Sequence, residues 1–182
     1  MRRLIDDGLT GRTILDLGCG SGRFSIEALK NGALSSVGMD LSPAMIATAS
    51  RFAGESGVGG KARFLVGDAA KQEHQFSDIV ILDKVVCCYP SIGELLSKAS
   101  SACHDRLGLI VPRDTGFTMI PVRVGVYLEN LIDRMRKNPV RMYLHSLDSV
   151  DNLLKRSGLR RKIAMVAGFW LVLIYERYYA VS

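Results

Sequence analysis

The feature that most constrains the fold is a short apolar run that ends in a glycine-rich bend and continues into a helix. Residues 13–17 (TILDL) are followed by Gly18, Gly20 and Gly22, and then by helical spacing up to Asn31. Glycine permits a left-handed backbone and a close approach of a ligand to the chain. The free N–H groups of the following helix favour an anionic group. This order predicts a strand, a ligand-binding bend and a helix.

The same alternation of apolar runs and helical stretches continues along the chain. It predicts strands at Ser36–Asp40, Ala62–Val66, Asp78–Leu82 and Leu107–Val111, a helix from Pro43 with Ser42 as N-cap, and a helix over Ile92–Cys103. The apolar runs are continuous, as in strands covered by helices on both faces. The pattern therefore predicts an α/β fold with a doubly wound, mostly parallel sheet.

The C-terminal third departs from this rhythm. It predicts a long helix over Val122–Lys137, a helix over Leu147–Ser157 between Ser146 as N-cap and Gly158 as stop, and strands at Lys162–Val166 and Leu171–Glu176 around the turn-like Ala167-Gly168. The two strands indicate a terminal antiparallel hairpin, which is common at the edge of a parallel sheet. We expect a single domain over residues 1–182, with seven strands in one sheet.

The composition is that of an ordinary globular domain of 182 residues, 48% hydrophobic and 23% charged. The sequence shows no signal-peptide pattern and no apolar run long enough to cross a bilayer. The four cysteines have neither zinc-ligand spacing nor the density of a disulfide scaffold. Cys87 and Cys88 would point to opposite faces of an extended chain, so no metal site is expected. Reduced thiols in a cytoplasmic protein are the simplest interpretation.

The net charge of +6 belongs to the C-terminal third. Residues 121–182 contain 11 Lys/Arg and 5 Asp/Glu, whereas residues 1–120 contain 13 of each. Lys155, Arg156 and the run 160–162 form either a solvated helix face or a field that attracts an anionic substrate, a membrane surface or nucleic acid. The sequence leaves both readings open.

Two details around the bend indicate the class of ligand. A dinucleotide fingerprint needs its third glycine where this chain has Arg23, which disfavours a nicotinamide dehydrogenase. Asp16, just before the bend, would repel a pyrophosphate. The same carboxylate suits a ligand with an ammonium group, such as the zwitterionic end of methionine.

Acidic residues after the next two strands complete a site that could bind an adenosine group. Asp40 is placed to accept hydrogen bonds from both ribose hydroxyls, or else to supply charge at the start of the helix at Pro43. Asp68 can meet the exocyclic amine of adenine, while Leu41 and Ala69 contact the ring.

In this order, the segments ILDLGCGSGRFS, VGMDLSPAMIATA, FLVGDAA and DIVILDKVVCCYP resemble the class I S-adenosylmethionine-dependent methyltransferases over residues 13 to about 111. The resemblance implies a Rossmann-like fold, S-adenosylmethionine as cofactor and S-adenosylhomocysteine as product. It implies cofactor-binding roles for Asp16, Gly18, Cys19, Gly20, Gly22, Asp40, Leu41, Asp68, Ala69 and Asp83. The C-terminal part, from the segment VPRD onward, is similar to magnesium-protoporphyrin IX O-methyltransferases and related small-molecule enzymes.

Three residues are candidates for catalytic roles on the side of the methyl acceptor. Arg113 can bind a substrate carboxylate through two parallel hydrogen bonds, or form a surface ion pair with Asp114. Tyr89 can contact the substrate, or be a surface tyrosine before Pro90. His145 is the general base by residue type, or a structural histidine at a helix start.

The leading expectation is methyl transfer to an oxygen of a small acidic, aromatic or tetrapyrrole-like molecule. One alternative is an RNA or protein methyltransferase that uses the basic C-terminal segment, although residues 82–85 (LDKV) lack the Asn/Asp-Pro-Pro-Tyr-like tetrapeptide of base-amino methyltransferases. The other is a non-catalytic cofactor-binding module. Only twelve residues precede Thr13, where related enzymes carry lid helices. We therefore expect a lid from elsewhere in the chain or from a second subunit, as in a homodimer, or else a truncated sequence.

Overall fold

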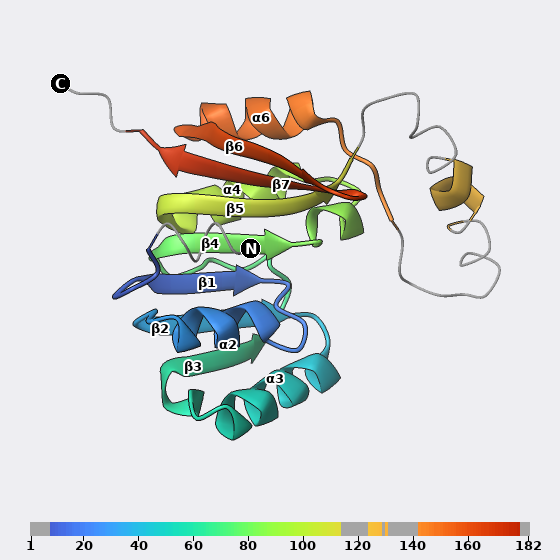
Figure 1. Ribbon diagram of the computed structural model, residues 1–182. Coiled ribbons are helices and arrows are strands. Elements are labelled where there is room, and N and C mark those ends of the chain that lie inside the picture. Colours follow the sequence, from blue (N-terminus) through green and yellow to red (C-terminus); the bar gives the residue numbers. More distant parts are fainter. Residues whose placement is uncertain (1–7, 114–123, 129, 131–141, 179–182) are drawn as a thin grey trace.

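The described strands form one seven-stranded sheet. The computed structural model describes residues 8–113, 124–128, 130 and 142–178. The strands are β1 (Thr13–Leu17), β2 (Ser35–Asp40), β3 (Ala62–Val66), β4 (Ser77–Asp83), β5 (Cys103–Pro112), β6 (Leu159–Ala167) and β7 (Trp170–Arg177), in the order β3-β2-β1-β4-β5-β7-β6 (Figure 1). The pairs from β3 to β5 are parallel, and β7 runs antiparallel to both β5 and β6. The predicted α/β architecture and terminal hairpin are confirmed.

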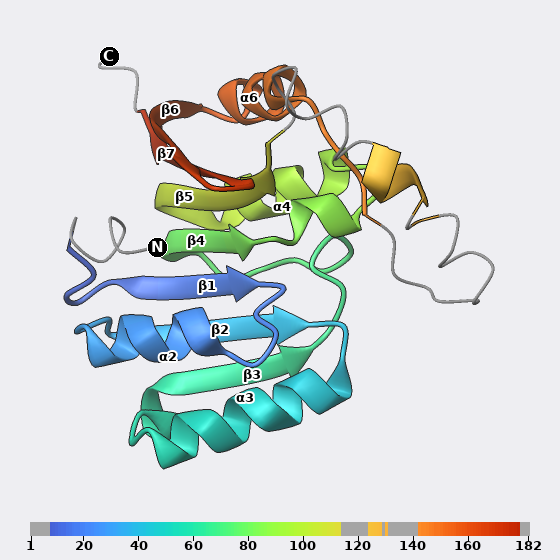
Figure 2. The ribbon, with the colours of Figure 1, turned by 45° about the vertical axis from the view of Figure 1, so that its right-hand side comes forward.

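Helices cover both faces of the sheet, as continuous apolar strands require. They are α2 (Arg23–Lys30), α3 (Pro43–Glu55), α4 (Gly93–Ala102) and α6 (Leu147–Arg156), with short 3-10 turns η1 (Gly59–Lys61) and η2 (Val86–Cys88). Helices α2 and α3 lie on one face, and α4 and α6 lie on the other (Figure 2). None of the helices described is long and apolar enough to span a membrane.

The predicted helix ends are confirmed at the level of individual caps. The Ser42 hydroxyl accepts a hydrogen bond from the Met45 N–H at 3.3 Å, and Pro43 opens α3. The Ser146 hydroxyl accepts from the Ser149 N–H at 3.2 Å at the start of α6. Gly158 follows α6 with φ at 78°, a left-handed conformation that ends the helix.

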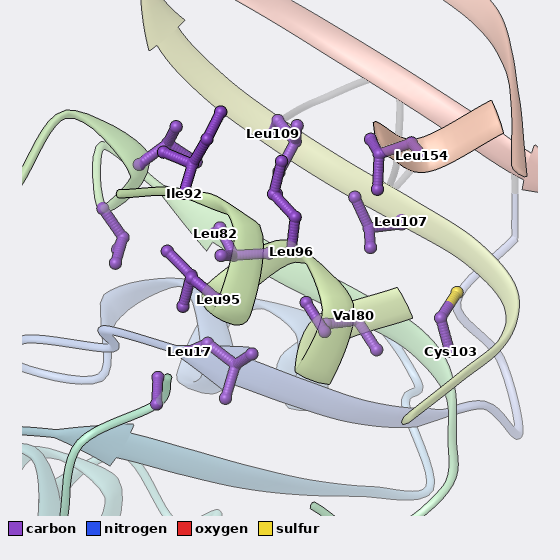
Figure 3. Packing of buried hydrophobic residues seen from close by; sticks show 14 of the residues in the cluster. Leu17, Val80, Leu82, Ile92, Leu95, Leu96, Cys103, Leu107, Leu109 and Leu154 are labelled. Atoms are coloured by element: carbon purple, nitrogen blue, oxygen red, sulfur yellow. The ribbon is translucent and has the colours of Figure 1, made fainter. Parts of the chain in front are cut away.

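Alternate residues of the central strands build two cores. Ile14 and Ile79 pack with Phe24 of α2 on one face. On the other face, Leu17, Val80, Leu82, Leu107 and Leu109 meet Leu95 and Leu96 of α4 and Leu154 of α6 (Figure 3). Full burial of one such side chain contributes about 1.5–3 kcal/mol. The cores therefore fix the ends of β1, β2 and β4, where the polar residues of interest lie.

Two local expectations are wrong. Strand β5 begins at Cys103 rather than Leu107, because Cys103 pairs with Ser77 before a register shift in β4. Cys87 and Cys88 are not extended, since they form η2, and both thiols approach the same carbonyl oxygen of Lys84. The predicted helix at 122–137 falls mostly outside the described residues, although 124–128 are helical.

Candidate functional site

A cavity of about 630 Å³ opens at the carboxyl ends of β1, β2 and β4. Its lining residues are Gly18, Met39, Asp40, Leu41, Ser42, Gly67, Ala69, Asp83, Lys84, Val85, Cys88 and Tyr89. The volume is within the range of about 300–1,000 Å³ of small-molecule sites, and the place is where open α/β sheets bind ligands. Five of the predicted cofactor residues, Gly18, Asp40, Leu41, Ala69 and Asp83, line this cavity.

The glycine bend is left-handed at all three predicted positions, with φ of 72° at Gly18, 51° at Gly20 and 74° at Gly22. A β-carbon at Gly18 would lie 2.2 Å from a methyl carbon of Val85. A β-carbon at Gly20 would have no atom within 4 Å. Gly18 therefore lets the cavity wall pack closely, whereas the space at Gly20 stays open to a ligand.

Asp40 is held against the bend by two backbone donors. The Gly20 N–H donates to Oδ2 and the Ser42 N–H donates to Oδ1, each at 2.9 Å. Each carboxylate oxygen therefore keeps acceptor capacity for one more donor. Two oxygens oriented in this way match two neighbouring hydroxyl groups, such as those of a ribose. Leu41, the next residue, is 62% exposed and offers an apolar surface beside them.

Asp16 lies beneath the bend rather than in the cavity wall. Its side chain is buried, with 1% exposure, and Oδ2 accepts a hydrogen bond from the Ser25 hydroxyl at 2.8 Å. Burial raises the pKa of Asp16 to about 7, and the charges of Asp83 and Asp40 add to this effect. A cationic ligand group nearby would favour the ionised carboxylate.

Asp83 has an unused acceptor. Its Oδ1 atom is buried and accepts no hydrogen bond from any described residue. A buried polar atom without a partner is costly unless a ligand or water supplies the donor. Together with Asp16 and Asp40 it gives this end of the cavity an excess of acceptors, which fits a ligand carrying ammonium and hydroxyl groups.

Asp68 and Tyr89 are joined across the cavity wall. Asp68 Oδ1 accepts hydrogen bonds from the Ala70 N–H at 3.0 Å and the Tyr89 hydroxyl at 2.8 Å, while Lys71 lies 3.6 Å from Oδ2. Burial raises the pKa of Asp68, but these donors outweigh it and the net pKa is lowered. Burial and the bond to Asp68 raise the pKa of Tyr89, so its hydroxyl stays protonated.

Cys19 fills the inside of the bend. Its buried thiol lies 3.7 Å from the Gly20 carbonyl oxygen, and a β-carbon at Gly38 would lie 2.9 Å from the Cys19 sulfur. Burial raises the pKa of this thiol. Cys19 therefore supports the bend as a neutral packing group.

His145 is connected to the same wall. Its Nε2 atom lies 2.8 Å from the Tyr89 carbonyl oxygen, and the Tyr143 N–H donates to the Cys87 carbonyl oxygen at 2.7 Å. Because a carbonyl only accepts, Nε2 must carry the proton, which leaves Nδ1 as the basic atom of the neutral ring. A cavity of about 20 Å³, the size of one water, lies between His145 and Cys87.

The tip of the β6–β7 hairpin contacts the cavity wall through Lys84. The Lys84 ammonium lies 5.1 Å from the ring centre of Trp170, and Phe169 packs edge-on against Trp170 at 5.2 Å. The backbone N–H of Arg113 donates to the Phe169 carbonyl oxygen at 3.0 Å. Asp114, the alternative ion-pair partner of the Arg113 side chain, lies outside the described residues.

The sequence places Lys84 just past a predicted strand end, where ligands bind in such sheets, but gives it no specific role. Its φ of 62° is the one positive value recorded for a described residue other than glycine, and such a conformation costs a lysine roughly 1 kcal/mol. A backbone angle of this kind has no sequence signal. The contact of Lys84 with Trp170 could not be predicted from the sequence either, because it joins residues 86 positions apart.

Two basic side chains of β6, Arg161 and Lys162, lie away from the cavity. Arg161 pairs with Asp151 at 2.7 Å and Lys162 with Glu176 at 2.6 Å, at the end of the hairpin opposite its tip. These ion pairs favour a solvated surface over a field directed at the ligand site, but residues 160–162 lie on strand β6 and not on the predicted helix face.

Comparisons with known proteins agree with this geometry. Residues 14–105, half of the chain, match the family described as a methyltransferase domain. Magnesium-protoporphyrin O-methyltransferase of Rhodobacter capsulatus is 34% identical over 169 residues, which cover 88% of this chain and 71% of that protein. Ribosomal protein L11 methyltransferase of Histophilus somni is 40% identical over 92 residues, which cover 48% of this chain and 31% of that protein.

A solved structure shares the fold along nearly the whole chain. The magnesium protoporphyrin IX methyltransferase of Synechocystis PCC 6803, crystallised with bound SAH, superposes with a TM-score of 0.79 at 23% identity. The match covers 96% of this chain and 78% of that one. With the family match over the glycine bend and the strands around it, this chain belongs to the class I S-adenosylmethionine-dependent methyltransferases.

Proposed function

We propose that this enzyme methylates an oxygen of a small, planar molecule that carries carboxylates, of the magnesium-protoporphyrin type. The observation that supports this most is the pairing of the Lys84 ammonium with the Trp170 ring beside the cofactor cavity. An aromatic face next to a cation suits a flat aromatic acid. The relative in Rhodobacter capsulatus, named for magnesium protoporphyrin, supports the same class of acceptor.

The cofactor residues predicted from the sequence have consistent roles in this proposal. The amino-acid end would lie along Gly18–Gly22, with its ammonium near Asp83 and above Asp16. Asp40 would accept from the ribose hydroxyls. Leu41 and Ala69 would contact the adenine ring, and Asp68 would accept from its amine in place of the exposed, weak ion pair with Lys71. Cys19 would support the bend from inside.

Methyl transfer depends more on the positioning of the acceptor than on general acid–base catalysis. S-adenosylmethionine, when bound, supplies an electrophilic methyl group on a positively charged sulfur. The protein has to hold the acceptor oxygen in line with that methyl group and to exclude water. A carboxylate oxygen carries no proton at neutral pH, so this acceptor needs no general base.

Two cations would bind the acceptor, Lys84 in the cavity wall and Arg113 directly after β5. Lys84 and Arg113 would hold its carboxylates, with the Arg113 guanidinium able to bind one of them in two-pronged fashion. Trp170 and Phe169 would support the ring system. The packing of Phe169 against Trp170 is compatible with contact between Trp170 and the substrate.

His145 and Tyr89 would then act by holding the cavity wall. The Tyr89 hydroxyl is committed to Asp68 and its carbonyl oxygen to His145. For a phenolic acceptor, the His145 Nδ1 atom would be the proton acceptor. We also propose a cytoplasmic location, which is supported by four cysteines without disulfide bonds.

The RNA and protein alternatives receive less support. The basic side chains of β6 lie at the opposite end of the hairpin from the cavity and are engaged in ion pairs. The ribosomal protein L11 methyltransferase relative shares only the cofactor half of this chain. We keep a single catalytic domain as the simplest organisation, because all described strands belong to one sheet.

The test is a methylation assay with S-adenosylmethionine and magnesium protoporphyrin IX, with its dimethyl ester and the flavonoid apigenin in parallel. We expect a monomethyl product from the free acid that alkali converts back, because an ester hydrolyses and an ether does not. The dimethyl ester should not be methylated, because its carboxylates are already esterified. A protein that binds S-adenosylhomocysteine but methylates only apigenin would contradict the acceptor class and leave the cofactor site intact.

A further inference from the structure

Cys88 lines the cofactor cavity, its neighbour Cys87 is buried, and the proposed methyl transfer uses neither thiol. Cys87 and Cys88 lie in η2, directly after the strained Lys84. Their sulfur atoms lie 3.3 Å and 3.5 Å from the same Lys84 carbonyl oxygen. The turn therefore directs both thiols to one side, which an extended chain would not do.

The two thiols differ in access. Cys88 is exposed and lines the cavity beside Asp40 and Tyr89, whereas Cys87 is buried behind it. An oxidant that enters the open cavity would therefore meet Cys88 first. Cys19 and Cys103 are buried elsewhere in the fold.

The two thiols also differ in reactivity. A hydrogen bond from the Cys87 thiol lowers the pKa of Cys88 to about 7, although burial and the charge of Asp40 oppose this. The hydrogen bond with Cys88 raises the pKa of Cys87, and burial adds to this effect. The lowered pKa favours the thiolate form of the exposed Cys88, which is the form that reacts with peroxides, next to a Cys87 thiol that stays protonated.

We propose that Cys88 is an oxidation site in the cofactor cavity and that Cys87 is its resolving thiol, with a hydroperoxide as oxidant. The Cys88 thiolate attacks the outer peroxide oxygen, so that an S–O bond forms, the O–O bond breaks and the alkoxide leaves with a proton from water. The Cys87 sulfur then attacks the Cys88 sulfur, an S–S bond forms, and the sulfenic oxygen leaves as water with the Cys87 proton. Two thiols are oxidised and one hydroperoxide is reduced to an alcohol and water.

The disulfide would distort the cavity wall. Adjacent Cα atoms lie about 3.8 Å apart, whereas a relaxed disulfide joins Cα atoms about 4.4–6.8 Å apart. The turn must therefore deform, and it leads directly into Tyr89, which connects Asp68 to His145. A strained disulfide is readily reduced, so cellular thiols would restore the cavity.

The test is to treat the intact protein with hydrogen peroxide, to measure its mass and to titrate it with S-adenosylhomocysteine by calorimetry. We expect the loss of two hydrogen atoms, a peptide containing the Cys87–Cys88 disulfide, and at least about tenfold weaker binding, which dithiothreitol reverses. Bound S-adenosylhomocysteine should slow the oxidation. Cys88→Ser and Cys88→Ala should bind equally with and without peroxide, whereas Cys103→Ser should respond like the wild type.

Several results would overturn the proposal. One is a disulfide that leaves binding unchanged, and another is a stable oxygen adduct or a disulfide between two chains in place of the internal bond. Equal sensitivity of Cys88→Ser would exclude Cys88 as the site. The untreated protein distinguishes failure of this proposal from failure of the proposed cofactor site. If it does not bind S-adenosylhomocysteine before oxidation, the proposed cofactor site is contradicted, and not the role of the thiol pair.

Discussion

The region proposed to bind the cofactor and the region proposed to bind the acceptor, here called the cofactor half and the acceptor half, are built differently. The cofactor half takes its polar groups from the ends of β1, β2 and β4, directly after buried strands, so that neighbours in the site are set by the sheet register. The acceptor half joins distant segments, as Lys84 does with Trp170 and Tyr89 with His145. Parallel strands thus position a site through local sequence, whereas a hairpin and a loop position one through tertiary contact.

The largest effect is expected at Asp40, the centre of the cofactor half. Asp40→Ala removes the acceptor for two hydroxyl groups, each hydrogen bond to a charged group being worth about 1.5–3 kcal/mol. We expect affinity for S-adenosylhomocysteine to fall at least about 100-fold in calorimetry. Asp148→Ala, which removes an exposed carboxylate in the first turn of α6, should change it by less than about twofold. Similar losses in both variants would contradict the local character of this half.

The two glycines of the bend separate packing from ligand access. Gly18→Ala and Gly20→Ala both place a side chain in a left-handed conformation, which costs roughly 1–2 kcal/mol. Only the β-carbon at Gly18 would collide with Val85, at a further cost of about 1–3 kcal/mol. Urea denaturation should show the larger loss of stability for Gly18→Ala. Equal losses would mean that the Val85 contact is not a constraint.

Asp16 offers a pH test. Its carboxyl ionises near pH 3.8 in the unfolded chain but near pH 7 in the folded protein, so the folded state binds more protons between these values. Stability therefore falls as the pH rises from about 4 to 7, and the full penalty remains above pH 7. Asp16→Asn removes the charge and should stabilise the protein at pH 8 by about 2 kcal/mol, within the limit of about 1.4 kcal/mol per pKa unit.

The gain from Asp16→Asn should be much smaller at pH 5 than at pH 8, and urea denaturation at the two pH values measures it. The same variant should bind S-adenosylhomocysteine more weakly, because a neutral amide attracts an ammonium group less than a carboxylate does. A gain that is independent of pH would show that burial does not shift the ionisation of Asp16.

The smallest effects are expected in the acceptor half. Lys84→Gly relieves the left-handed backbone and removes the ammonium, so it should raise stability by roughly 1 kcal/mol and weaken acceptor binding about tenfold. Trp170 is the single tryptophan of the chain, so its fluorescence reports binding of magnesium protoporphyrin IX. Lys84→Arg should retain the affinity. If the dimethyl ester binds the wild type as tightly as the free acid does, the anionic acceptor is contradicted.

How far the sequence predicts the structure follows the same division. The bend at Gly18–Gly22, the cap at Ser42 and the acidic strand ends were predictable because each depends on local conformation and periodicity. Three features could not be predicted, because they depend on packing around the residue. They are the burial of Asp16 under Ser25, the Asp83 oxygen that has no partner among the described residues, and the left-handed backbone of Lys84. The side-by-side thiols of Cys87 and Cys88 were mispredicted because a 3-10 turn replaced the assumed extended chain.

A crystal structure of the complex with S-adenosylhomocysteine would show whether Asp40 binds the ribose of the cofactor. We expect both ribose hydroxyl oxygens to lie within hydrogen-bond distance of the two Asp40 carboxylate oxygens, about 2.5–3.0 Å, with the amino-acid end along Gly18–Gly22. Ligand density at another place, with the Asp40 carboxylate still bound only to the Gly20 and Ser42 N–H groups, would contradict it.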